Sequence, residues 1–86
     1  MLKITTTQDD GFERELKLEG RLMAEWVGVL QDAVRTAQVE CGRLQLDLGD
    51  LKFVDATGTI ALRELIRQGV VITTVSPFVG ELLKEK

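Results

Sequence analysis

The chain of 86 residues has no histidine, no tyrosine, one cysteine, one proline and one tryptophan. Without histidine the chain lacks the commonest general base and metal ligand, and the lone Cys41 can form no internal disulfide bond. These absences exclude Ser-His and Cys-His catalysis and a zinc site. We therefore expect neither a metal ion nor another cofactor.

Long apolar runs are missing as well. No run approaches the roughly 18 residues that a membrane-spanning helix needs. The first residues, MLKITTTQDD, lack the charged, apolar and small-residue zones of a secretory signal peptide. We therefore expect no membrane insertion and a cytoplasmic location, with which a single cysteine agrees.

Charge is plentiful but nearly balanced. Eleven Lys and Arg residues and fourteen Asp and Glu residues give a formal net charge of -3. The sequence contains no arginine cluster and no interleaving of basic with aromatic residues, the patterns that bind phosphodiester backbones, so nucleic acid is not an expected partner. The length and the hydrophobic content of 44% predict one small globular domain over residues 1–86.

The first half of the chain changes period once. Residues 2–7 and 12–22 alternate between inward-facing and polar positions, which predicts two half-buried strands, and the Asp10-Gly11 pair between them favours a tight hairpin turn. The inward positions are Leu2, Ile4, Thr6, Phe12, Leu16, Leu18, Gly20 and Leu22. Residues 24–40 then carry an apolar stripe with helical spacing, which predicts an amphipathic helix.

The second half predicts a strand, a helix, a strand and a helix. Residues 43–48 alternate again, and Gly49-Asp50 is expected to break this strand. A helix of about ten residues should follow residues 55–58, with Ala61, Leu62, Leu65 and Ile66 on its buried face. The β-branched run 70–75 is typical of a central strand covered on both faces. Pro77 suits the first turn of a last helix, with Phe78, Val79, Leu82 and Leu83 apolar and Glu81, Lys84, Glu85 and Lys86 in solvent.

The predicted element order is ββαβαβα. This order indicates an α/β fold in which a mixed sheet opens with an antiparallel hairpin and is packed by helices.

One local pattern, GDLKFVDATG at residues 49–58, leads from a strand into a helix. Asp55 is expected to cap that helix, and Thr57 and Gly58 fall in its first turn, where backbone N–H groups and the helix dipole favour an anion. Two interpretations stay open, a structural cap and a phosphate or nucleotide site. Neither a P-loop nor a GxGxxG pattern is present.

The arrangement LxLxGRL, a helix, LQLDLGDLKFVDATG, a second helix and GVVITTVSPFVGELL resembles a STAS domain, the domain of bacterial anti-sigma-factor antagonists. The resemblance covers nearly the whole chain, and its specific part is the LDL strand, the Phe53-Val54 pair and the D-x-T-G turn. It implies a STAS-like fold and a module for protein-protein interaction in transcription regulation, not an enzyme. The implied partner is an anti-sigma factor of the GHKL kinase type. A related role is that of an accessory subunit on the ATPase of a lipid-transport ABC transporter.

On this resemblance the residues expected to contact a partner are Asp55, Ala56, Thr57, Gly58, Ile60 and Arg63. Many STAS domains are switched off by phosphorylation of the residue after the turn aspartate, because a phosphate adds roughly 1.5 to 2 negative charges to the docking surface. That position is Ala56, which has no hydroxyl, so the switch is expected to be absent and Thr57 is the second-best acceptor.

Two further departures from the family pattern are visible. The acidic residue of the frequent G-x-L-D pattern is replaced by Met23, and ten residues separate Gly58 from Gly69, about one helical turn fewer than the family implies. A shorter second helix would make the docking surface smaller.

Single residues admit two interpretations each. Ile60 lies roughly opposite the apolar stripe of its helix and is either an exposed contact residue or buried by an irregular first turn. Trp26 belongs either to the core or to a homodimer interface, and Cys41 is a small core residue rather than a reactive thiol. For the whole chain, a homo-oligomeric structural domain is a further alternative.

Overall fold

The computed structural model describes residues 1–84 and confirms the predicted α/β class and the order ββαβαβα. Its elements are β1 (Leu2–Asp9), β2 (Glu13–Leu22), α1 (Ala24–Glu40), β3 (Arg43–Val54), α2 (Ala56–Arg67), β4 (Val71–Val75) and α3 (Pro77–Leu83). None of the helices in this part of the chain is both long enough and apolar enough to cross a lipid bilayer.

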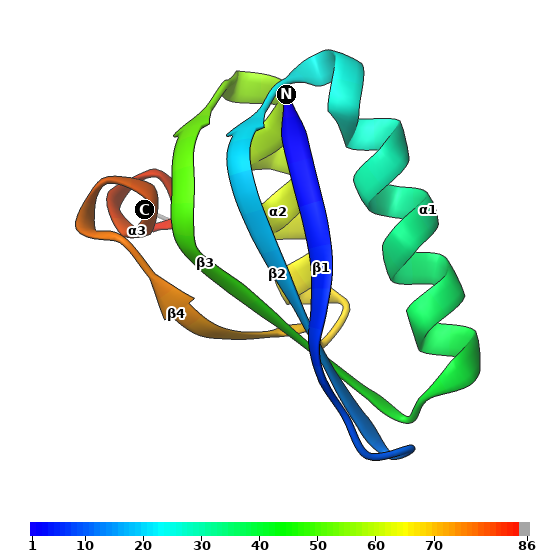
Figure 1. Cartoon of the computed structure of the whole chain (residues 1–86). Helices are drawn as coiled ribbons and strands as arrows, with labels where there is room; N and C mark the ends of the chain where they lie inside the picture. The colour runs from blue at the N-terminus through cyan, green and yellow to red at the C-terminus, as the bar shows by residue number, and fades with distance from the viewer. Residues whose placement is uncertain (85–86) are drawn as a thin grey trace.

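The four strands form one mixed sheet in the order β1-β2-β3-β4. The β1 and β2 strands are an antiparallel hairpin, as predicted, whereas β3 runs parallel to both β2 and β4. Helices α1 and α2 lie side by side on one face of the sheet, and α3 lies beside β3 (Figure 1). Among the described residues no element covers the other face, so the fold has two layers.

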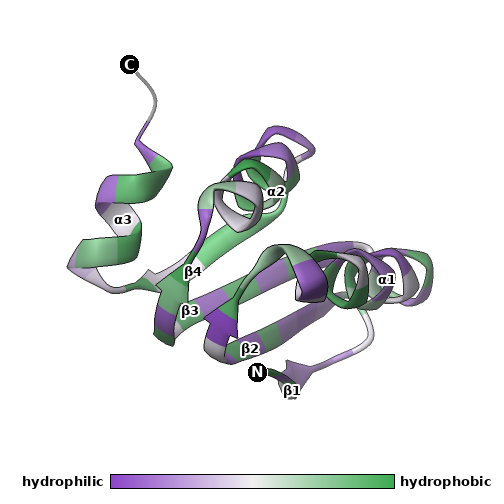
Figure 2. Ribbon diagram, turned by 90° about the horizontal axis from the view of Figure 1, so that it is seen from above, coloured by the Kyte–Doolittle hydropathy of each residue, from purple (hydrophilic) through white to green (hydrophobic). Residues whose placement is uncertain are grey.

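Leucine side chains fill the space between sheet and helices. The alternation predicted for β2 and for the first half of β3 is confirmed by buried leucines on one face, which are Leu16, Leu18 and Leu22 in β2 and Leu44, Leu46 and Leu48 in β3. Figure 2 shows hydrophobic and hydrophilic residues alternating along these strands. The fully buried side chains are Leu18, Leu22, Leu30, Leu46, Leu48, Leu62 and Val79. Burial of a leucine stabilises the fold by about 1.5 to 3 kcal/mol, and these contacts connect all three helices to the sheet.

The uncovered face of the sheet is polar. Thr7 Oγ1 and Thr73 Oγ1 both donate hydrogen bonds to the Glu15 carboxylate, at 2.9 and 2.7 Å. These bonds, that from Thr73 first, hold the pKa of Glu15 below its ordinary value. Lys17 and Asp50 form an ion pair at 2.7 Å, which lowers the pKa of Asp50 and raises that of Lys17. These bonds link polar side chains of different strands across the uncovered face.

The prediction of a central strand for residues 70–75 is wrong. The β4 strand pairs only with β3 and forms an edge of the sheet, and its five residues are exposed or half-buried. The other side of β3 is already paired with β2, so the last strand can join only at the outside. The apolar β-branched run therefore correctly predicted a strand, but it did not predict whether that strand is central or at an edge of the sheet.

The predicted break at Gly49-Asp50 is also wrong, because β3 continues to Val54. In the pairing with β2, Lys17 lies opposite Asp47 and Glu19 opposite Asp50, so β3 carries one extra residue at this point. Gly49 N donates a hydrogen bond to Asp47 Oδ1 at 2.9 Å. A β-bulge thus absorbs the glycine within the strand.

Other expectations fail at the ends of elements. Phe12 is 80% exposed and Thr6 is exposed, because the hairpin tip lies at the end of the sheet, beyond both helices (Figure 1). Helix α2 has 12 residues rather than about ten, because it begins immediately after Asp55. Ile66 is exposed rather than buried, since it lies on the flank of α2 that lines a hollow next to α3.

Helix α3 begins as predicted, with Pro77 in its first turn and Ser76 Oγ accepting a hydrogen bond from Val79 N at 3.3 Å. Its apolar face is narrower than predicted, because Val79 is buried whereas Phe78 is 53% exposed. Glu81 and Lys84 lie in solvent as predicted. The predicted exposure of Glu85 and Lys86 falls outside the described residues.

Candidate functional site

The turn between β3 and α2 is held by the Asp55 carboxylate. Asp55 Oδ1 accepts a hydrogen bond from Gly58 N at 2.7 Å, so Asp55 caps α2 as predicted. Asp55 Oδ2 accepts a second hydrogen bond from Ala24 N at 2.9 Å, in the first turn of α1. One side chain thereby bonds the starts of both large helices, a role that the sequence did not reveal because the two positions are 31 residues apart.

The turn lies where two parallel strands end. Phe53 is opposite Arg21 and Val54 is opposite Leu22, so β2 and β3 end at the same edge of the sheet. Asp55 N donates a hydrogen bond to Leu22 O at 3.1 Å. In open α/β sheets this edge, at the carboxyl ends of parallel strands, is the usual place for a binding site.

Gly58 is required by close packing. A Cβ atom at this position would lie 2.7 Å from Leu22 O and 3.0 Å from Val54 Cγ1. The first turn of α2 therefore approaches the end of β2 more closely than any side chain allows. Gly58 is buried, so it contributes to a partner-binding surface through the position of the helix rather than through direct contact.

Three of the residues predicted to contact a partner do lie on the surface here. Ala56 and Thr57 are exposed, and Ile60 is 67% exposed, which excludes the alternative of a buried Ile60. Thr59 differs from Thr57, because its hydroxyl donates to Asp55 O at 2.9 Å and the residue is buried. Thr57 thus carries the accessible hydroxyl of this turn.

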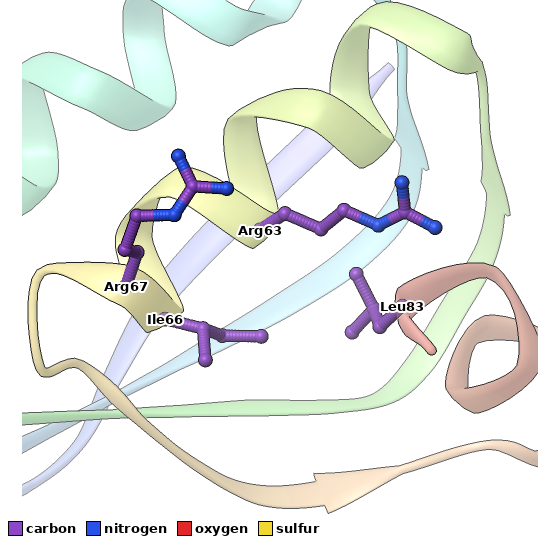
Figure 3. A pocket seen from close by; sticks show the side chains of 4 residues that line it. All are labelled: Arg63, Ile66, Arg67 and Leu83. Carbon is purple, nitrogen blue, oxygen red and sulfur yellow. The ribbon is translucent and has the colours of Figure 1, made fainter. Parts of the chain in front are cut away.

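The structure places Arg63 away from the turn, against α3. Arg63 Nη2 donates hydrogen bonds to Leu82 O at 2.8 Å and to Lys84 O at 2.9 Å, and so satisfies carbonyl groups at the end of α3. Within residues 1–84 its Nε is buried without a hydrogen-bond partner. Figure 3 shows Arg63 reaching from α2 towards Leu83, at a hollow of about 230 Å³ that Ile66 and Arg67 also line.

A second hollow, of about 390 Å³, lies at the ends of β2 and β3. It is lined by Arg21, Met23, Lys52 and Phe53. Met23 is the residue before α1, whose first turn is bonded to Asp55, so this hollow adjoins the 55–58 turn. Sequence reasoning noted Met23 only as a missing acid, because the approach of Lys52 and Phe53 to it depends on the pairing of β2 with β3.

The structure also shows the surroundings of Trp26 and Cys41. Trp26 is half-buried and packs against the core, in line with its core interpretation. Cys41 is buried, and its Sγ donates to Ala37 O at 2.9 Å, as expected for a small core residue. In the described part of the chain, no group of three or more Cys, Asp and Glu side chains is arranged to hold a metal ion.

No protein-family model matches the chain, and no curated protein matches it in sequence. Solved structures do match. The anti-sigma factor antagonist SpoIIAA in its unphosphorylated form aligns with a TM-score of 0.72 and 16% identity, over 93% of this chain and 80% of SpoIIAA.

Two further structures are similar in fold. A DUF3478-family protein with a SpoIIAA-like fold from Shewanella loihica PV-4 aligns with a TM-score of 0.58 and 17% identity, over 91% of this chain and 68% of its own. Mglu in its native form aligns with a TM-score of 0.56 and 18% identity, over 86% of this chain but only 23% of its own. The chain therefore has the SpoIIAA-like fold, which is the STAS-like fold that the sequence resemblance implies.

Proposed function

We propose that the chain is a protein-interaction module of the anti-sigma-factor antagonist kind. It docks on an anti-sigma factor of the GHKL kinase type through Asp55–Gly58 and the exposed start of α2. The fold similarity to SpoIIAA supports the class of module. The observation that carries the proposal is Ile60, an apolar side chain 67% exposed one turn after the capped start of α2.

The turn is already ordered before a partner binds, so docking should cost little conformational entropy. Asp55 is hydrogen-bonded to both α1 and α2, and Gly58 packs against β2, so Ala56, Thr57 and Ile60 project from a fixed frame. A preordered surface loses less entropy when it binds than a flexible loop does. An exposed apolar side chain on such a surface serves as a binding hot spot when a partner buries it at the centre of the interface.

We also propose that the chain can always dock, because phosphorylation of the turn does not switch it off. Ala56 occupies the position that many STAS domains phosphorylate, and it has no hydroxyl to accept a phosphate. Thr57 is the remaining candidate in the turn. A partner kinase should therefore phosphorylate an Ala56→Ser variant much faster than the wild-type chain, as measured by mass spectrometry of the intact proteins; equal modification at Thr57 in both would contradict this part of the proposal.

We propose a non-catalytic role. The chain has no histidine to serve as a general base. The nucleotide or phosphate alternative loses support as well, because Gly58 N, a donor that an anion would need, is already bonded to Asp55 Oδ1. The docking surface is thus the better-supported use of this turn.

The experiment is a calorimetric titration of the protein with each purified anti-sigma factor of the source organism. Ile60→Glu should weaken binding at least tenfold, which corresponds to about 1.4 kcal/mol. Val39→Glu is the matched control, because Val39 is 83% exposed near the end of α1 and should leave the affinity unchanged. The proposal would be contradicted if the Ile60→Glu variant bound with the same affinity as the wild-type chain, or if the wild-type chain bound none of these proteins. Binding to a lipid-transport ABC ATPase instead would transfer it to the accessory-subunit role.

A further inference from the structure

Most cationic side chains of the described chain are bonded within the molecule. Arg63 donates to backbone carbonyls of α3, and six other Lys and Arg residues form ion pairs with Asp or Glu. These six are Arg14, Lys17, Arg35, Arg43, Arg67 and Lys84. Within residues 1–84, Lys3, Arg21 and Lys52 form no ion pair, although the charge of Lys52 still contributes to the lowered pKa of Asp50.

These three cations gather at one end of the sheet. Lys3 is at the start of β1, opposite Glu19 near the end of β2, and Arg21 lies opposite Phe53, the neighbour of Lys52 on β3. Figure 1 places the N-terminus beside the ends of β2 and β3, in agreement with this pairing. The unpaired cations therefore concentrate at one place on a chain whose formal net charge is -3.

The hollow between them combines charge with apolar surface. Arg21 and Lys52 are both exposed and flank Met23 and Phe53, of which Phe53 is 41% exposed. A large apolar side chain left open between two cations is suited to a ligand that carries both a negative charge and an apolar group.

The nearby acids compensate only part of the positive charge of this hollow. Asp50 is bonded to Lys17 at 2.7 Å, and both carboxylate oxygens of Asp55 accept backbone N–H groups. Glu19 lies opposite Lys3 and Asp50, on the strand before Gly20 and Arg21, and forms no ion pair among the described residues. Glu25, two residues after Met23 in the first turn of α1, is exposed and also forms no ion pair in this part of the chain. Two carboxylates, those of Glu19 and Glu25, therefore stand against three side-chain cations at this end of the sheet.

We infer that this hollow binds an acidic segment of a partner protein, in which Asp or Glu side chains flank an aromatic or leucine side chain. The carboxylates would bond Arg21 and Lys52, and the apolar side chain would rest on Phe53 and Met23. A nucleic acid fits less well, because three cations beside an apolar floor offer few contacts to successive phosphates. The inference deepens the proposed function, since the hollow adjoins the 55–58 turn.

The test uses a fluorescent peptide in which Asp and Glu residues surround a Phe-Leu pair, and measures its binding by fluorescence anisotropy. We expect binding that weakens at least tenfold in the Arg21→Glu/Lys52→Glu double variant. The control is Arg35→Glu/Lys84→Glu, which changes the net charge equally at exposed sites elsewhere and should alter the affinity less than twofold. Should charge reversal prevent folding, Arg21→Gln/Lys52→Gln removes the cations without adding anions.

The inference would be overturned by equal peptide binding in both double variants, or by equal binding of a peptide with Lys in place of Asp and Glu. Tighter binding to single-stranded DNA or to phosphatidylserine vesicles would overturn it too. Absence of peptide binding would also overturn it. The proposed function fails separately. If Ile60→Glu abolishes anti-sigma-factor binding while Arg21→Glu/Lys52→Glu does not, the docking proposal stands and the binding of an acidic segment is excluded. If the peptide binds but no anti-sigma factor does, the acidic-segment site stands and the docking proposal is excluded.

Discussion

Helices α1 and α2 start at the same end of the sheet but are held there differently. The N-cap residue of α2 is Asp55, whose carboxylate accepts a hydrogen bond from Gly58 N, whereas the N-cap residue of α1 is Met23, whose side chain makes no capping bond. The second Asp55 oxygen bonds Ala24 N and partly compensates for this lack. The start of α1 thus depends on Asp55, which lies in the turn between β3 and α2. A substitution of Asp55 should therefore destabilise the first turns of both helices.

The two helices also use glycine differently. Gly58 in α2 is packed against Leu22 O, while a Cβ at Gly28 in α1 would meet nothing within 4 Å. The same residue type therefore serves close packing in one helix and only weakens the other, because glycine costs about 0.5 to 1 kcal/mol relative to alanine inside a helix. Substitutions at the two N-cap residues, Asp55 and Met23, and at the two glycines, Gly58 and Gly28, measure how differently the two helices are stabilised.

The largest effect is expected from Gly58→Ala. The new Cβ would lie 2.7 Å from a backbone carbonyl oxygen, so α2 must move away from the end of β2. We expect a loss of about 3 kcal/mol in the free energy of unfolding, measured by urea denaturation. An unchanged midpoint would mean that α2 can shift freely, and the fixed frame assigned to the turn would then be wrong.

Asp55→Ala should come next, with a loss of about 2 kcal/mol, because an N-cap is removed from α2 and the bond to α1 is lost with it. Hydrogen exchange should increase in the first turns of both helices. Asp55→Asn keeps one carbonyl oxygen and should lose about half as much. Faster exchange in α2 alone would show that the bond to Ala24 contributes nothing to α1.

Gly28→Ala is the counterpart of Gly58→Ala in α1 and should have the opposite sign. Gly28 is exposed and its position is open, so alanine should raise the free energy of unfolding by about 0.5 to 1 kcal/mol. Thermal unfolding of both variants under identical conditions measures the contrast. Destabilisation by Gly28→Ala would remove the difference between the two helices.

The smallest effect is expected from Met23→Ser, which gives α1 a capping hydroxyl but removes a half-buried methionine. The net change in stability should lie within about 0.5 kcal/mol of zero. The informative quantity is the double-mutant cycle, in which the loss caused by Asp55→Ala should fall by about 0.5 kcal/mol in the Met23→Ser background. Additive losses would indicate that the two positions act independently on α1.

Much of the fold was predictable because its elements have strong periods. The alternation of Leu16, Leu18 and Leu22 set the inner face of β2, and the β-branched run 70–75 identified a strand. The Asp55 cap also followed from spacing along a single helix, whereas the sequence left Ile60 open between an exposed and a buried position. Predictions failed where the outcome depended on a neighbour: β4 became an edge because β2 already occupies the other side of β3, and Gly49 was absorbed by a bulge against β2.

The candidate site divides in the same way. The exposed turn residues Ala56, Thr57 and Ile60 were named from the resemblance to STAS domains, which aligns the D-x-T-G turn with the start of α2. Arg63 was also named, but its bonds to Leu82 O and Lys84 O needed α3 to pack beside α2. The hollow between Arg21 and Lys52 was missed, because no local pattern marks it.

The sequence by itself determined the order of helices and strands, the buried leucine positions of β2 and of the first half of β3, and the place where α2 is capped. These properties depend on residues a few positions apart, whose geometry is set by helix and strand periods. Only the tertiary structure decided that Asp55 also holds α1, that β4 is an edge strand, and that Arg21 and Lys52 line one hollow at the end of the sheet. Such properties depend on strand order and register, which bring together residues that are distant along the chain.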